Sequence, residues 1–170
     1  MIPSSHGDEQ WLVGILSVAI ILGSKSDLPV ARAAGDVLKE LGIPFTLHVA
    51  SAHRSPGLLK ELVEASLADV FIGIAGLSAA LPGAIASHTL RPVIGVPVSG
   101  KVNLDAILSI VQMPPGIPVA AVGLDSGANA AVLAAQILAL KDPSLAQRLA
   151  ARRMQMLENV MADSKEIENG

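Results

Sequence analysis

The sequence contains no cysteine and no tyrosine, and aromatic residues make up only 2% of its 170 positions. Without cysteine the chain can form no disulfide, no thiolate metal site and no cysteine nucleophile. The few aromatic rings, Trp11, Phe45 and Phe71, cannot build a platform on which nucleic-acid bases stack. A net charge of −3 supplies no general basic field. We therefore expect no nucleic-acid partner.

Charge is also scarce, at 16% charged against 51% hydrophobic residues, and the mean hydropathy is +0.56. This composition excludes a disordered chain, and it predicts that copies of the chain bury surface against one another. The apolar runs are too short for a spanning helix, which needs about 20 residues. Asp8 and Glu9 precede the first apolar run, so no secretory signal fits. We expect a cytoplasmic homo-oligomer that does not contact membranes.

Short apolar runs alternate with segments whose apolar residues recur at helical spacing, a pattern typical of βαβ units and a parallel sheet. The predicted strands cover residues 17–22, 45–50, 70–75, 92–96 and 118–122. The predicted helices cover about 28–41, 56–67, 83–89, 104–111, 129–140 and 144–160. The expected fold is α/β: a flavodoxin-like three-layer sandwich with a five-stranded parallel sheet, helices on both faces and an extra C-terminal helix.

Ligands of such sheets bind outside the carboxyl ends of the strands, which selects the loops 23–27, 51–56 and 76–83. The first loop offers Ser24, Ser26 and Asp27 at the start of a helix. Its free N–H groups suit an anion, and its carboxylate suits ribose hydroxyls. A simple helix-capping cluster explains these residues equally well. The loop has neither the Walker nor the dinucleotide-binding glycine pattern.

The second loop brings Ser51, His53 and Arg54 to the end of one strand. A histidine there can donate and accept protons near neutral pH, and an arginine can clamp a phosphate. The alternative is an ordinary surface pair in a turn.

The third loop, Ala75 to Gly83, consists of small residues that let a ligand approach the backbone closely. Taken by itself, the loop is better explained by tight packing of a helix on the sheet.

Six segments in family order resemble the catalytic subunit of phosphoribosylaminoimidazole carboxylase, a family that includes the N5-carboxyaminoimidazole ribonucleotide mutases of purine biosynthesis. They are GSKSD (23–27), SAHRSP (51–56), AGLSAALPG (75–83), PVIGVPV (92–98), SIVQMPPGIPVA (109–120) and NAAVLAAQILAL (129–140). The resemblance covers about residues 17–141. It implies a flavodoxin-like enzyme that assembles as an octamer. We accordingly expect residues 1–12 to be a flexible arm, 13–163 a single catalytic domain and 164–170 a tail.

The resemblance also implies roles for residues. His53 would be the catalytic residue. The substrate-binding residues would be Ser24, Ser26, Asp27, Ser51 and Arg54 around the ribose phosphate, with Gly76, Ser78, Ala79, Ala80 and Leu81 around the carboxylate and CO2. No metal or other cofactor is expected. The implied reaction is an isomerisation: N5-carboxyaminoimidazole ribonucleotide becomes 4-carboxy-5-aminoimidazole ribonucleotide, by decarboxylation and recarboxylation, on the route to IMP.

One position departs from the bacterial mutase pattern, in which the third loop contains AAHLPG. Ala80 stands where those mutases carry histidine, and the loop is similar to that of the lyases that carboxylate aminoimidazole ribonucleotide directly with CO2. Arg54, in contrast, follows the mutase pattern. A mutase is therefore favoured, with the direct carboxylase as the alternative. A non-catalytic flavodoxin-like module remains a third hypothesis, although the loops lack an aromatic ring to stack on a flavin.

Overall fold

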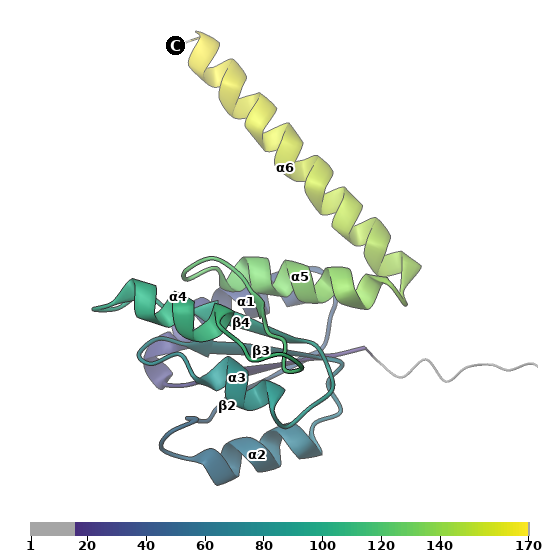
Figure 1. Cartoon of the computed structure of the whole chain (residues 1–170). Coiled ribbons are helices and arrows are strands. Elements are labelled where there is room, and N and C mark those ends of the chain that lie inside the picture. Colours follow the sequence, from purple (N-terminus) through teal and green to yellow (C-terminus); the bar gives the residue numbers. More distant parts are fainter. Residues whose placement is uncertain (1–15, 170) are drawn as a thin grey trace, which may run out of the picture.

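The computed structural model describes residues 16–169, which form one five-stranded, wholly parallel sheet with helices on both faces (Figure 1). The strand order is β2-β1-β3-β4-β5. The strands are β1 Val18–Leu22, β2 Phe45–Val49, β3 Val70–Ala75, β4 Val93–Pro97 and β5 Ala120–Ala121. The chain leaves β1 in one direction to form β2 and then crosses back to β3. This reversal is the switch point at which doubly wound sheets bind ligands.

Two layers of helices cover the sheet, which confirms the predicted three-layer sandwich. The helices are α1 Leu28–Glu40, preceded by the short 3-10 helix η1 Lys25–Asp27, then α2 Pro56–Ala65, α3 Leu81–Ala86, α4 Asn103–Val111, α5 Gly127–Ala139 and α6 Pro143–Asn169. One hydrophobic cluster joins the sheet to α1 and α5, and another joins it to α2, α3 and α4. Alternate residues of β1 serve both clusters, Ile20 the first and Ile21 the second, because side chains of a strand alternate between faces.

A glycine pair in the sheet lets α3 and α4 approach closely. Gly73 of β3 and Gly95 of β4 lie opposite one another. A Cβ on Gly73 would lie 2.9 Å from the side chain of Ile85, and one on Gly95 would lie 2.5 Å from that of Ile110. Those distances are shorter than real carbon contacts allow. The absence of two Cβ atoms therefore sets the height of α3 above the sheet, and with it the position of the loop that precedes α3.

Several predicted boundaries differ from the structure. Helix α3 begins at Leu81 rather than 83 and ends at Ala86 rather than 89, since Pro82 is well suited to a first helical turn. Strand β5 is only two residues long rather than 118–122, since only Ala120 and Ala121 pair with β4. Helix α6 does not end near 160 but continues to Asn169, as residues 161–169 contain neither glycine nor proline. The predicted arm, 1–12, lies outside the described residues.

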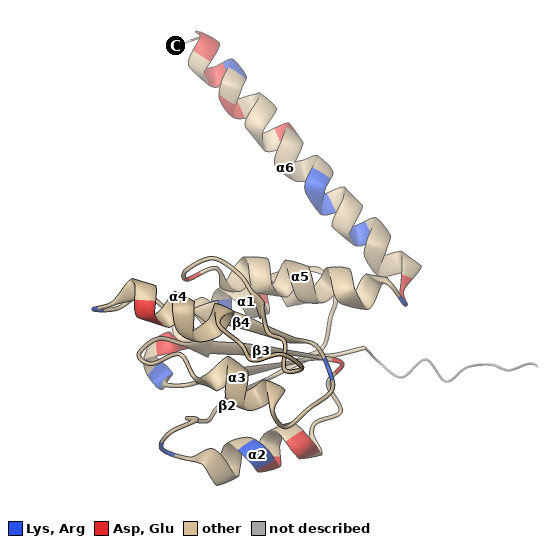
Figure 2. Cartoon of the chain, in the orientation of Figure 1, with Lys and Arg blue, Asp and Glu red and all other residues tan. Residues whose placement is uncertain are grey.

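Helix α6 projects away from the rest of the chain (Figure 1). It packs on α5 near its start, where Leu145 is its one buried residue, and Arg152 forms an ion pair with Glu40 of α1. Figure 2 shows charged residues on α2 and along α6, whereas α3 and α5 carry none. Among the described residues, no helix is both long enough and apolar enough to cross a membrane.

Candidate active site

The three predicted loops meet at the carboxyl edge of the sheet and enclose a cavity of about 540 Å³. The loop after β1 contributes Ser24, Ser26 and Asp27, and the loop after β2 contributes Ser51, His53 and Arg54. The loop after β3 contributes Gly76, Ser78 and Leu81. Strand-end loops of a parallel sheet converge in this way because every strand points to the same edge.

The first loop is organised around the Asp27 carboxylate, which is 6% exposed. One carboxylate oxygen, Oδ2, accepts the Ser24 N–H at 3.0 Å, and the other, Oδ1, accepts the Ser26 hydroxyl at 3.2 Å. Burial raises the pKa of Asp27 above its ordinary value, while these hydrogen bonds and the positive charge of Arg54 oppose the rise. The helix-capping interactions, given above as the alternative explanation of this loop, are therefore present in the structure. They fix the carboxylate at the edge of the cavity.

Arg54 connects the first two loops. Its Nη2 donates to the Gly23 carbonyl at 2.8 Å, and its Nε donates to the Ser51 hydroxyl at 3.3 Å. The Ser51 hydroxyl also accepts the Arg54 backbone N–H at 3.2 Å. A guanidinium has five N–H donors, so this side chain keeps donors for an anionic ligand while it spans both loops.

His53 lies beside Arg54 in the same turn, and its side chain is exposed and lines the cavity. The turn is braced by Ser55, whose hydroxyl accepts the Ser51 N–H at 2.9 Å and donates to the Ser51 carbonyl at 3.3 Å. An exposed imidazole on a braced turn can exchange protons with both ligand and solvent, which is what acid–base catalysis requires.

Two residues of the third loop lie elsewhere than predicted. Ala79 is fully buried in the hydrophobic cluster beneath α3, and neither Ala79 nor Ala80 lines the cavity. The turn explains this: the Ala80 N–H donates to the Ser78 carbonyl at 2.8 Å, and the Ala80 carbonyl then accepts the Ala84 N–H at 3.0 Å as α3 begins. Gly76, Ser78 and Leu81, together with Leu77, form this side of the cavity.

A fourth segment, which the sequence analysis missed, also lines the cavity: Val98, Ser99 and Gly100 after β4. The Val98 N–H donates to the carbonyl of Ala75 at 3.0 Å, so this segment lies against the start of the third loop. None of these three residues has a titratable side chain. The carboxyl-edge rule, applied to β4 as it was to the other strands, would have found it.

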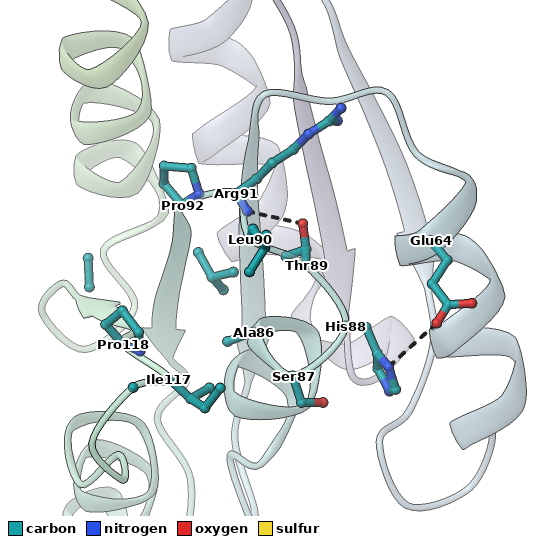
Figure 3. A pocket seen from close by; sticks show the side chains of 13 residues that line it. Glu64, Ala86, Ser87, His88, Thr89, Leu90, Arg91, Pro92, Ile117 and Pro118 are labelled. Atoms are coloured by element: carbon teal, nitrogen blue, oxygen red, sulfur yellow. Dashed lines mark hydrogen bonds and ion pairs between the residues drawn. The ribbon is translucent and has the colours of Figure 1, made fainter.

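A larger cavity, about 770 Å³, opens at the opposite edge of the sheet near the amino ends of β4 and β5 (Figure 3). Its ionisable groups are already paired. His88 Nδ1 lies 3.9 Å from Glu64 Oε1, and the Arg91 guanidinium donates to the carbonyls of Ser66 and Ala68. The carboxyl-edge cavity, where Asp27, His53 and Arg54 converge, is therefore the better candidate. Across residues 16–169, no three histidine, aspartate or glutamate side chains gather as metal ligands.

A doubly wound sheet with a polar cavity at its switch point defines a ligand-binding α/β protein of the flavodoxin-like class. Within that class the chain belongs to the AIR carboxylase family, whose model matches residues 17–159. This confirms the resemblance in the sequence.

Two relatives with the same name show what this chain is similar to. A Methanocaldococcus jannaschii protein named N5-carboxyaminoimidazole ribonucleotide mutase is 56% identical over 151 residues, covering 88% of this chain and 96% of the relative. A Bacillus subtilis protein of the same name is 43% identical over 157 residues, covering 88% and 97%. Among solved structures, Treponema denticola PurE superposes with a TM-score of 0.77 at 30% identity, covering 88% of this chain and 96% of that one.

Proposed function

We propose that this chain is an isomerase, an N5-carboxyaminoimidazole ribonucleotide mutase that produces 4-carboxy-5-aminoimidazole ribonucleotide in purine biosynthesis. The observation that carries the proposal is the convergence of His53, Arg54 and Asp27 on one cavity. The name shared by relatives that are 43% and 56% identical supports the same activity.

The first two loops together bind the ribonucleotide, one at its ribose and the other at its phosphate. Arg54 binds the phosphate through the guanidinium donors that Gly23 and Ser51 leave free, since arginine suits phosphate oxygens in charge-assisted pairs. Asp27, held by Ser24 and Ser26, accepts hydrogen bonds from the ribose hydroxyls. Ser24, Ser26 and Ser51 complete the polar wall around the ribose phosphate.

His53 supplies the acid–base chemistry. As imidazolium it gives a proton to the exocyclic nitrogen that carries the carbamate, the bond from nitrogen to the carboxyl carbon breaks, and CO2 is released. The electron-rich ring carbon then attacks CO2 and forms the new carbon–carbon bond. The proton left on that tetrahedral ring carbon returns to His53, so atoms and charge balance and no redox cofactor or metal takes part. One histidine suits both steps because an imidazole ring can both donate and accept a proton.

The released CO2 must stay next to the ring carbon between the two steps. We assign this space to Gly76, Ser78 and Leu81, with Ala79 and Ala80 supporting the turn from the side of α3. Small residues let the CO2 lie close to the backbone, whose N–H groups can orient its oxygens. Outside this site, we propose assembly into a homo-oligomer, an octamer, and a cytoplasmic location, where a phosphorylated intermediate of biosynthesis is made and consumed.

The direct carboxylase is the second candidate, because the third loop presents no titratable side chain at Ala79 or Ala80. A steady-state assay of both ribonucleotides, with and without bicarbonate, separates the two. A mutase converts the carbamate without added bicarbonate and uses aminoimidazole ribonucleotide poorly. A carboxylase shows the reverse, and a non-catalytic module converts neither. His53→Asn is the catalytic control: its turnover should fall at least about a hundredfold, the usual contribution of acid–base catalysis, while the substrate still binds.

A further inference from the structure

We propose that Asp125 is a positioning residue, which holds the β4–α4 loop, residues 98–102, closed over the CO2 side of the cavity. This inference rests on the proposed function and deepens it. Asp125 does not line the cavity itself. It lies between β5 and α5, next to the point where the chain leaves β4.

Two hydrogen bonds join Asp125 to that point. Its carboxylate Oδ1 accepts the Ser99 N–H at 2.8 Å, and its own N–H donates to the Pro97 carbonyl at 2.8 Å. Among the described non-glycine residues, Asp125 alone has a positive φ, 56°. Aspartate tolerates this left-handed conformation better than most residues do. A single residue in this conformation therefore holds the end of β4 through both its backbone and its side chain.

The rest of the loop is anchored on either side of Ser99. The Val98 N–H donates to the Ala75 carbonyl at 3.0 Å, and the Gly100 N–H donates to the Asn103 side-chain oxygen at 2.8 Å. A Cβ on Gly76 would lie 3.4 Å from the Val98 carbonyl oxygen, so the third loop and the β4–α4 loop are in close contact. Ser99 and Gly100 line the cavity after β4, whereas His53 and Arg54 line it after β2, so β1 and β3 lie between the two loops in the sheet.

The β4–α4 loop forms a wall of the cavity that suits CO2 better than it suits the phosphate. The residues of this loop that line the cavity, Val98, Ser99 and Gly100, carry no charge, and Lys101 of the same loop does not line it. The anchoring carboxylate of Asp125 accepts a backbone N–H and does not line the cavity either. In the proposed reaction, aminoimidazole ribonucleotide and CO2 either recombine or separate. Opening this wall favours separation, whereas the binding of the phosphate by Arg54, in another loop, is unaffected. Loss of the Asp125 carboxylate should therefore change the partition of the intermediate and not the KM.

The test uses two substitutions at one position. Asp125→Gly keeps the left-handed backbone conformation and removes the side-chain oxygen that accepts the Ser99 N–H. Asp125→Asn keeps the backbone conformation and also a side-chain oxygen that can accept this N–H. The enzyme is given N5-carboxyaminoimidazole ribonucleotide in ¹³C-bicarbonate with carbonic anhydrase, and spontaneous decarboxylation is subtracted with an enzyme-free sample. The measured quantities are KM, the ratio of released aminoimidazole ribonucleotide to product, and the ¹³C content of the product.

Asp125→Gly should raise that ratio and the ¹³C incorporation about fivefold to tenfold, as expected for the loss of one hydrogen bond of typical net strength, with KM unchanged. Asp125→Asn should restore wild-type values. Asp142→Gly is the matched control, because Asp142 likewise accepts backbone N–H groups, from Ser144 and Leu145 at the start of α6, away from the cavity. Its ratio should equal that of the wild type.

An active, folded Asp125→Gly enzyme with a wild-type ratio overturns the positioning role alone. A wild-type chain that converts no carbamate overturns the proposed function, and this inference with it. Should Asp125→Gly fail to fold, Asn103→Gly tests the same wall through its second anchor, at Gly100. A wild-type ratio in that variant also counts against the inference.

Discussion

Arg54 connects the first two loops of the site, and its positive charge also opposes the rise in the pKa of Asp27. Its bonds to the Gly23 carbonyl and the Ser51 hydroxyl span the gap between the ends of β1 and β2. This single residue therefore has a structural role, joining the two loops, and a proposed role in binding the phosphate. A substitution at this position has to be assessed for folding and for binding separately.

Arg54→Ala should raise KM for the ribonucleotide roughly tenfold to a hundredfold, because a charge-assisted hydrogen bond contributes about 1.5–3 kcal/mol. A phosphate contact held equally in the ground and transition states leaves kcat nearly unchanged. Steady-state kinetics and a melting curve on the same sample check both points. Arg148→Ala is the control, since Arg148 pairs with Asp142 and Ser144 at the start of α6. An unchanged KM in a folded Arg54→Ala protein would remove the residue from the binding site.

Asp27 gives a prediction for pH. Its pKa in the folded chain is raised above 3.8, chiefly by burial, so folding favours its protonated form. Its contribution to stability is greatest below the unfolded pKa and declines as the pH rises through the folded pKa. Asp27→Asn removes this titration. The melting temperature of Asp27→Asn minus that of the wild type should therefore increase as the pH rises from about 3 to 7. A difference that stays constant or falls over this range would contradict the assigned direction.

At the scale of elements, the glycines beneath α3 and α4 decide how closely these helices pack. Gly95→Ala should destabilise the chain by about 1–3 kcal/mol, the usual cost of overpacking a core, because its Cβ would lie 2.5 Å from Ile110 Cγ2. Gly57→Ala in α2 is the matched control, with no atom within 4 Å of its Cβ. There the same change should stabilise the helix by about 0.5–1 kcal/mol. Denaturant unfolding measures both, and equal effects in the two variants would show that packing is not the cause.

The elements also show how far the sequence predicts this molecule. Strand β3, buried on both faces, is a continuous apolar run and was found to the residue. Strand β5 is predicted too long because the apolar run 118–122 does not show that only Ala120 and Ala121 pair with β4. Three loops of the site followed from the edge at which parallel strands end. The β4–α4 loop was missed because Ser99 and Gly100 look like ordinary turn residues. Ala79 was assigned to the site from the family resemblance, which does not show where a side chain in a turn points.

At the scale of the whole molecule, α6 has an apolar surface that residues 16–169 of one chain do not cover. Met154 and Leu157 are 56% and 51% exposed, and Val160 and Met161 are 65% and 52% exposed. At 100° per residue these four side chains share one face of the helix. They lie beyond the Arg152–Glu40 ion pair, where α6 has left the domain (Figure 1). Exposed apolar surface of this kind is typical of interfaces, so we expect copies of the chain to meet through this face, in line with the low content of charge.

The chain should therefore sediment at a multiple of 17.4 kDa, and a charge on this face of α6 should lower the mass. Leu157→Glu places a carboxylate in the centre of the apolar face, where its burial against another subunit would cost several kcal/mol. Asn159→Glu introduces the same charge about 160° away around the helix and serves as the control. Sedimentation velocity at micromolar concentration should give smaller species for Leu157→Glu alone. A wild-type chain that sediments as a monomer would disprove the oligomer. An unchanged Leu157→Glu assembly would show that subunits meet through another surface, with the exposed edge strand β2 and its Leu47 and Val49 as the next one to substitute.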